Sequence, residues 1–228
     1  MLSTQDLRVS YGMSEVIHGI SFTVGETETV AIMGRNGMGK TTLFKSLIGI
    51  MPAEGSIRIG DEDVGKRQAY ERVQRGLAYV PQGRLVFGTL TVEENIAAGL
   101  EATGRRKIPG DIYDLFPVLR DMRRRKAGNL SGGQQQQLAI ARALAADPKV
   151  LLLDEPTEGI QPSIIKDLAK TLNEIKRTRQ ISIVVSEQVL SFATTIADRM
   201  LVLDKGKIAH EAAGADIDAE KISRYLTV

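Results

Sequence analysis

The chain has 228 residues, of which 43% are hydrophobic and 25% charged, and its formal net charge is +2. This is the composition of a folded globular protein with its own hydrophobic core, and the near-neutral charge argues against a protein that coats nucleic acid. The absence of cysteine excludes disulfide scaffolds, thiolate zinc sites, iron–sulfur clusters and cysteine nucleophiles. Because no stretch approaches the roughly 20 apolar residues that cross a bilayer, we expect a cytosolic protein with only peripheral membrane contacts.

Short apolar segments predict the strands of an α/β core. Continuous apolar runs, which are typical of buried parallel strands, occupy residues 29–33, 76–80, 150–153 and 181–186. Alternation of apolar and polar side chains, which is typical of half-exposed antiparallel strands, occurs at residues 7–11 and 57–59. Helical patterns follow two of the apolar runs, so we expect a largely parallel sheet accompanied by a smaller antiparallel part.

The middle third of the chain differs from the rest. Residues 83–127 have no strong strand pattern, whereas residues 92–100 and 111–119 have helical patterns, and residues 218–225 predict a terminal helix. We therefore interpret residues 83–139 as an α-helical subdomain inserted into a core formed by residues 1–82 and 140–228. The whole chain is then a single domain.

A glycine-rich segment is the strongest chemical signal. Residues 34–42 fit the pattern G-x-x-x-x-G-K-[ST], and they lie between a predicted strand and a predicted helix, which is the context that this phosphate-binding motif requires. Glycines let backbone amides wrap around an anion, and the helix N-terminus adds positive charge. Lys40 can then bind the β- and γ-phosphates and the Thr41 hydroxyl can ligate Mg²⁺. The candidate phosphate-binding residues are Gly34, Asn36, Gly37, Gly39, Lys40, Thr41 and Thr42.

Two acidic residues follow the apolar run at 150–153. At the end of a strand beside a phosphate loop, Asp154 is the candidate Mg²⁺ carboxylate, and Glu155 is the candidate that holds the attacking water, as a general base or by orienting it. Two acids after a strand are more often a loop start or a helix cap. Because the chain also contains a phosphate loop, the catalytic interpretation of Asp154 and Glu155 is preferred over a loop start or a helix cap.

A third motif lies far from the first two. The segment LSGGQ at residues 130–134 precedes a helical pattern, and Ser131 can cap that helix while the glycines leave amide hydrogens free for a phosphate. Taken alone, the segment is a capped helix after a flexible loop. With the other two motifs, it gives the chain two anion-binding helix ends.

These three motifs, in this order, identify a family resemblance. Over nearly its whole length the chain resembles the nucleotide-binding subunit of ABC transporters, with Walker A at residues 34–42, Walker B at 150–155 and the signature at 130–134. The resemblance implies a P-loop NTPase fold: a RecA-like core with an antiparallel β-subdomain and an inserted α-helical subdomain. It also implies ATP and Mg²⁺ as cofactors. Tyr11 would stack on adenine, and Gln82 would reach Mg²⁺ and sense the γ-phosphate.

The same resemblance implies partners. Two ATPase chains, alike or unlike, would pair head to tail, so that Ser131 and Gly133 of one chain cover the ATP on the other. The helical subdomain would pass this closure to transmembrane permease subunits, with residues 82–87 forming much of the docking groove. An extracytoplasmic solute-binding protein would be an indirect partner. The chain would lie peripherally at the cytoplasmic face of a bacterial inner membrane.

Two positions depart from the common family pattern. Gln188 stands where most members have a histidine that contacts the γ-phosphate, and Gln161 stands where an aspartate is usual. The Gln188 amide can donate a hydrogen bond but cannot carry a proton. The resemblance therefore gives Glu155, Lys40 and Gln188 as the catalytic residues.

A glutamine at this position resembles importers of the branched-chain amino acid class, which pair two unlike ATPase chains. Within that class, the segments that resemble the branch for urea and short-chain amides are residues 108–113, 131–137 and 155–166. The expected function is ATP-driven uptake of urea or short-chain amides, with branched-chain amino acid uptake as the alternative. A soluble ABC ATPase acting on ribosomes or DNA is a further alternative, and a P-loop kinase would leave the signature segment and Gln82 without a role.

Overall fold

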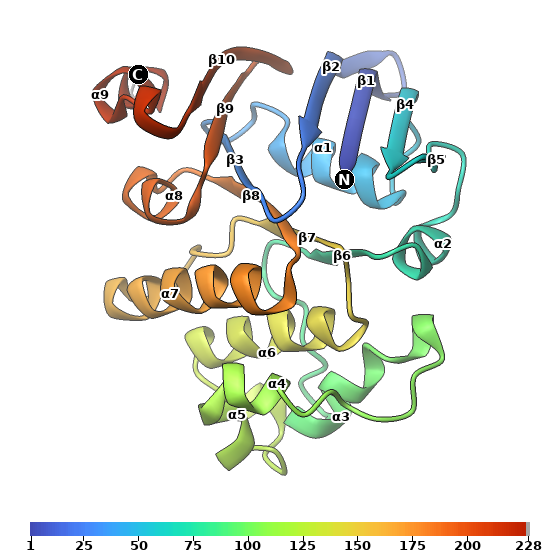
Figure 1. Ribbon diagram of the computed structural model, residues 1–228, viewed down its shortest axis with the longest axis vertical. Coiled ribbons are helices and arrows are strands. Elements are labelled where there is room, and N and C mark those ends of the chain that lie inside the picture. The colour runs from blue at the N-terminus through green and yellow to red at the C-terminus, as the bar shows by residue number, and fades with distance from the viewer. Residues whose placement is uncertain (227–228) are drawn as a thin grey trace.

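A six-stranded sheet forms the centre of the fold in the computed structural model, which describes residues 1–226 (Figure 1). The strand order is β10-β9-β3-β8-β7-β6, and all neighbours are parallel except the edge strand β10. The strands are β3 (Thr29–Met33), β6 (Leu77–Val80), β7 (Val150–Asp154), β8 (Ser182–Glu187), β9 (Arg199–Asp204) and β10 (Lys207–Ala213). The four strands predicted from apolar runs are present, and every residue of β3, β7 and β8 is buried.

A second, antiparallel sheet has the order β2-β1-β4-β5. Its strands are β1 (Leu2–Tyr11), β2 (Ser14–Val24), β4 (Glu54–Ile59) and β5 (Glu62–Asp63). The alternating patterns predicted β1 and β4. The long strand β2 was not predicted, because bulges shift its register against β1 and break the alternation of its side chains.

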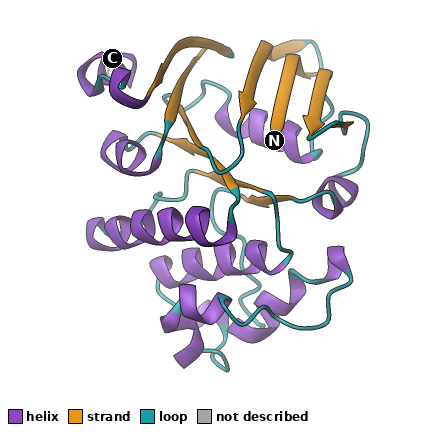
Figure 2. Cartoon of the chain, viewed as in Figure 1, coloured by secondary structure: helices purple, strands orange, loops and turns teal. Residues whose placement is uncertain are grey.

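The described residues contain nine α-helices, and helices are coloured purple in Figure 2. They are α1 (Lys40–Ile48), α2 (Ala69–Gln74), α3 (Val92–Ala98), α4 (Ile112–Leu115), α5 (Pro117–Asp121), α6 (Gly132–Ala145), α7 (Pro162–Arg179), α8 (Leu190–Ile196) and α9 (Ala219–Leu226). The predicted helix at 111–119 is divided into α4 and α5. Its break falls at Phe116, because the residue before a proline is disfavoured in helical conformation.

Two hydrophobic cores cover the two faces of the six-stranded sheet. Alternate side chains of the sheet point to opposite sides: Val30 and Leu152 pack with α1 and the antiparallel sheet, whereas Ala31 and Leu151 pack with α3 to α8. Figure 1 shows α1 and the antiparallel sheet in the upper half of the view and α3 to α6 in the lower half. The α/β expectation is confirmed.

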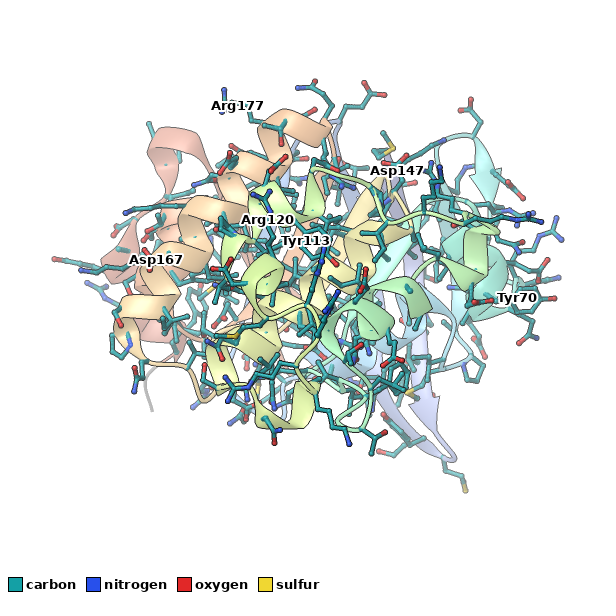
Figure 3. All side chains as sticks on the ribbon, turned by 90° about the horizontal axis from the view of Figure 1, so that it is seen from below. Tyr70, Tyr113, Arg120, Asp147, Asp167 and Arg177 are labelled. Atoms are coloured by element: carbon teal, nitrogen blue, oxygen red, sulfur yellow. The ribbon has the colours of Figure 1, made fainter. Side chains whose placement is uncertain are left out.

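The helical part is continuous with the core. Figure 3 shows the molecule from below the view of Figure 1, so that the helical part faces the reader. Tyr113 of α4 and Arg120 of α5 lie near the middle of this view, and Tyr70 of α2, which belongs to the core, lies at its edge. The predicted boundary between residues 139 and 140 falls inside α6, so one unbroken helix joins the two parts. Of the helices in residues 1–226, none has the length and apolar character that a bilayer span requires.

A buried arginine fixes the end of α1, the helix that begins with Lys40. Arg72 is 3% exposed, and its guanidinium donates to the carbonyl oxygens of Ser46 and Leu47 in the last turn of α1 at 2.7 and 2.8 Å. It also donates to the carbonyl oxygens of Arg67 and Gly65. The carbonyl oxygen of Leu47 is one that a helix C-terminus leaves without a partner, whereas that of Ser46 also accepts from the backbone amide of Gly49 at 3.1 Å.

We predict that Arg72→Met lowers the free energy of unfolding by about 1–3 kcal/mol, because it removes the side-chain donor from the carbonyl oxygens of Leu47, Arg67 and Gly65. Urea unfolding of the wild type and the variant measures the difference. Arg124→Met, at an exposed position, is the matched control and is expected to change little. Equal stabilities of the Arg72 and Arg124 variants would contradict the prediction.

Candidate active site

The predicted phosphate loop surrounds a small cavity at the carboxyl end of β3. The cavity has a volume of about 210 Å³ and is lined by Val16, Asn36, Gly37, Gly39, Lys40, Thr41, Thr42, Gln82 and Glu155. Sites that enclose a whole ligand usually measure roughly 300–1,000 Å³. The cavity therefore suits the phosphate end of a nucleotide and leaves the base outside it.

Lys40, the first residue of α1, is held in this cavity with its charge compensated. Its Nζ donates to the carbonyl oxygens of Gly34 and Arg35 at 2.6 and 3.0 Å and lies 2.9 Å from Oε1 of Glu155. The loop reaches this shape through Gly39, which has φ of 103° and where a Cβ atom would lie 2.8 Å from Cδ1 of Ile17. Only glycine fits at that point of the loop.

Asp154 is buried at the end of β7, where three hydroxyl groups hydrogen-bond to it. Oδ1 accepts from the Ser186 hydroxyl at 2.6 Å, Oδ2 accepts from the Tyr79 hydroxyl at 3.2 Å, and the Thr41 hydroxyl also donates to the carboxylate. Burial raises the pKa of Asp154, and these hydrogen bonds oppose that shift.

The residues predicted to hold Mg²⁺ fit that ion. Thr41 and Asp154 are in direct contact, and Gln82 lines the same cavity as Thr41. Hydroxyl, carboxylate and amide oxygens are the hard ligands that Mg²⁺ accepts, and few protein ligands are needed when phosphates supply the rest. Within residues 1–226 no group of three or more His, Cys, Asp or Glu side chains could hold a metal. The bound ion would neutralise charge on the phosphates.

Glu155 and Gln188 meet at the edge of the cavity. The Gln188 side-chain amide donates to Oε1 and Oε2 of Glu155 at 3.1 and 3.2 Å and to Oδ1 of Asn36 at 2.7 Å. Glu155 has φ of 46°, in the left-handed region, and its backbone amide donates to Ser186. This turn directs the carboxylate from the end of β7 back towards Lys40. The structure thus brings Lys40 and Gln188, the other two predicted catalytic residues, each into contact with Glu155.

Tyr11 lies beside the phosphate loop, at the end of β1. Its hydroxyl is 3.5 Å from Oγ1 of Thr42, and the side chain is 53% exposed. The ring is therefore exposed beside a residue that lines the cavity, and an exposed aromatic ring can stack on another aromatic group.

The signature residues lie elsewhere in the chain, as N-cap and first turn of α6. The Ser131 hydroxyl accepts a hydrogen bond from the backbone amide of Gln134, whose side chain accepts from the amide of Ser131. A Cβ atom on Gly133 would lie 2.7 Å from Cγ2 of Ile164, so α7 packs closely against this turn. Neither Ser131 nor Gly133 lines the phosphate cavity. One chain therefore holds two separate parts of the predicted site.

Sequence reasoning missed the polar end of β8 and the role of Arg84. Ser186 and Glu187 are fully buried polar residues at the end of an apolar strand, and that change in character was the available signal. Arg84 donates to the carbonyl oxygens of Glu158 and Gly159 at 2.8 and 3.2 Å, and it lies against Gly132. No local pattern in the sequence indicates these contacts of Arg84.

A mainly apolar groove lies between the Gln82 loop and the helical part. Its lining includes Leu85 and Phe87, both exposed, and Arg142, whose guanidinium lies 5.1 Å from the centre of the Phe87 ring. Of residues 82–87, which are expected to form much of a docking groove, only Leu85 and Phe87 line this one, and Gln82, Gly83, Arg84 and Val86 do not.

We predict that Asp154→Asn raises the free energy of unfolding at pH 8. Burial raises the pKa of Asp154, so the ionised carboxylate costs more in the folded chain than in the unfolded one. This cost disappears as the pH falls from the folded-state pKa to the ordinary value of 3.8, and the advantage of the variant should shrink over that interval. Urea unfolding at a series of pH values measures it.

The matched control is Asp167→Asn, at an exposed position on α7 labelled in Figure 3. It should leave the free energy of unfolding nearly unchanged at each pH. If Asp154→Asn gave no more stability at pH 8 than Asp167→Asn, buried charge would not be a cost at this site.

Comparisons with known proteins agree on a family. The model of the ABC transporter family matches residues 17–158. The chain is 38% identical over 219 residues to the high-affinity branched-chain amino acid transport ATP-binding protein BraG of Pseudomonas aeruginosa, with 94% of each chain covered. It is 34% identical over 215 residues to the lipopolysaccharide export system ATP-binding protein LptB of Haemophilus influenzae, covering 91% of this chain and 88% of that one.

A crystal structure of the ADP conformation of an ATP-binding cassette of an ABC transporter has a TM-score of 0.81 and 27% identity, and covers 99% of this chain and 94% of that one. The expected P-loop NTPase fold is confirmed. The chain is an ATPase with ATP and Mg²⁺ as cofactors, and ATPases of this kind dimerise and work with transmembrane permease subunits. The chain belongs to the ABC transporter family, as an ATP-binding subunit.

Proposed function

We propose that this chain couples ATP-driven closure of an ATPase dimer to the uptake of branched-chain amino acids through a membrane permease. The observation that carries the proposal is the 38% identity to a branched-chain amino acid transport ATPase over 94% of both chains. Gln188 supports it, because a glutamine at this position resembles that class. The lipopolysaccharide export ATPase of Haemophilus influenzae is less similar, at 34% identity.

Uptake of urea or short-chain amides stays a prediction from three sequence segments. The relatives described above include none that is named for urea, and they favour the amino acid alternative. An ATPase subunit does not touch the transported solute, so the site described here is compatible with either.

The phosphate end of ATP would occupy the cavity at the carboxyl end of β3. Lys40 would bind the β- and γ-phosphates, and the amides of the glycine-rich loop would donate to their oxygens. Thr41, Asp154 and Gln82 would hold Mg²⁺, and Tyr11 would stack on the base. The position of these residues in and around the cavity supports the proposed roles.

For hydrolysis to occur, Lys40 would have to release the Glu155 carboxylate and bind the phosphates of ATP instead. Glu155 and Gln188 are tied to each other, and Glu155 is also paired with Lys40. When the phosphates bind Lys40, the Glu155 carboxylate is released to orient water for attack on the γ-phosphorus, with cleavage of the bond to the β–γ bridging oxygen. The Gln188 amide can donate to a γ-phosphate oxygen in that arrangement.

The second half of the site would come from another ATPase chain. Ser131 and Gly133 do not line the phosphate cavity of their own chain, whereas the N-terminus of α6 is suited to an anion. A head-to-tail pair, formed by two copies or with an unlike companion, would bring this helix end to the ATP of the partner. ATP would then hold the two chains together until hydrolysis.

The groove beside the Gln82 loop is the proposed docking site for the permease. Leu85 and Phe87 expose apolar surface there, next to the loop that senses the γ-phosphate. We place the subunit peripherally at the cytoplasmic face of a bacterial inner membrane, with a solute-binding protein as an indirect partner.

If the chain drives uptake of branched-chain amino acids, stopping its ATP hydrolysis should reduce the uptake of those amino acids and not that of urea. In cells of the source organism that carry Glu155→Gln, we expect uptake of radiolabelled leucine to fall about tenfold or more, because the transporter cannot complete its cycle. Urea uptake should stay unchanged. Glu174→Gln, at an exposed position of α7, is the control for loss of one carboxylate. Loss of urea uptake with normal leucine uptake would instead support the urea prediction.

A further inference from the structure

Glu187, the last residue of β8, is a buried carboxylate that the proposed hydrolysis leaves without a role. Its side chain is 1% exposed, and each oxygen accepts two hydrogen bonds. Oε1 accepts from the backbone amide and the hydroxyl of Thr157 at 3.1 and 2.6 Å. Oε2 accepts from the backbone amides of Gln188 and Val189 at 2.9 and 3.1 Å. No cation pairs with this carboxylate in the part of the chain that the structure describes.

The four hydrogen-bond donors around this side chain explain why the residue is a glutamate. Burying a carboxylate without a cation is expensive, and burial raises the pKa of Glu187 while the hydrogen bonds oppose that shift. An apolar side chain would fill the space at lower cost. A carboxylate, however, offers acceptors on both oxygens, whereas the amide of a glutamine would turn a donor towards two of the four donors.

The contacts of Glu187 join three parts of the site. Its side chain ties the Thr157 loop, which leaves β7, to the segment that begins at Gln188. Its backbone carbonyl oxygen accepts from the amide of Gly34 at 3.3 Å, where the phosphate loop begins. Thr157 lies two residues after Glu155, in the turn that closes through the hydrogen bond from Glu158 to Glu155.

We propose that Glu187 is a positioning residue for ATP hydrolysis, which holds Gln188 and the turn after Glu155 in one arrangement. The inference rests on the proposed function, since it assumes that Glu155 orients the water and that Gln188 contacts the γ-phosphate. Glu187 acts through these two residues and touches no substrate. Its loss would let Gln188 move away from Glu155.

ATP binding does not depend on this arrangement. Lys40 is fixed by the carbonyl oxygens of Gly34 and Arg35, and Thr41 belongs to α1. Loss of the Glu187 carboxylate should therefore reduce kcat and leave KM for ATP nearly unchanged. A residue that only stabilised the fold would lower the amount of active protein without changing the kcat of the molecules that remain folded.

The test is ATP turnover by the assembled transporter carrying Glu187→Gln, Thr157→Val or both, corrected for the folded fraction. We expect kcat to fall about tenfold or more in Glu187→Gln with KM changed less than about threefold. The double variant should be scarcely worse than Glu187→Gln, because the two residues form one unit. Glu174→Gln is the control. A Glu187→Gln protein with the wild-type kcat would overturn the proposal.

A second measurement needs no turnover. Hydrogen exchange of the backbone amides of residues 188 and 189 should accelerate about tenfold or more in Glu187→Gln, while the amides of α1 keep their protection. Unchanged exchange at 188 and 189 would also overturn the proposal. Failure of the proposed function is distinguishable from both results, because it would appear as wild-type turnover in Glu155→Gln.

Discussion

The position of β8 between β3 and β7 is the constraint on which the rest of the site depends. Because these three strands are parallel, their carboxyl ends meet at one edge, with Met33 paired to Glu187 and Asp154 to Ser186. The phosphate loop leaves β3, the two acidic residues end β7, and the polar run that ends β8 lies between them. Ser186 holds Asp154, Glu187 holds the turn after Glu155, and Gln188 contacts Glu155 itself. One strand end thus sets the mutual positions of the groups that other segments supply.

This arrangement concentrates buried charge, which the fold must compensate. Lys40, at the start of α1, and Asp154 and Glu187, at the ends of the neighbouring strands β7 and β8, are almost wholly buried. Burial raises the pKa of both Asp154 and Glu187. Dense hydrogen bonding reduces this cost without removing it. The compensating stability comes from the two hydrophobic cores on either face of the six-stranded sheet, since alternate residues of its buried strands contribute to both.

Local patterns in the sequence predicted the features that are themselves local. The buried strands, the phosphate loop with its following helix and the cap at Ser131 all follow from neighbouring residues. The order of the strands does not follow from neighbouring residues, because strand pairing joins segments that are far apart in the sequence. The same is true of the side-chain contacts in the site: Gln188 contacts Asn36, 152 positions away, and Glu155, 33 positions away. Bulges in β2 disrupted the alternating pattern that would have predicted it, and a proline divided the predicted helix at 111–119. The contacts of Arg84 have no signature in the adjacent sequence, and those of Glu187 are indicated only by a polar residue at the end of an apolar strand. Ser131 does not line the phosphate cavity of its own chain, and this agrees with the proposal that two chains together form each ATP site.

The central claim is that Lys40 and Glu155, which form an ion pair of 2.9 Å, have different functions. Parallel measurements of ATP affinity and ATP turnover in Lys40→Ala and Glu155→Gln test it most directly, with unfolding monitored in both. The account predicts weakened ATP binding in Lys40→Ala, and near-normal binding with loss of turnover in Glu155→Gln. A structural ion pair would give another result, because removing either partner of a buried pair destabilises the fold in the same way. Equal loss of stability, with binding and turnover unchanged in the folded molecules of both variants, would contradict the account.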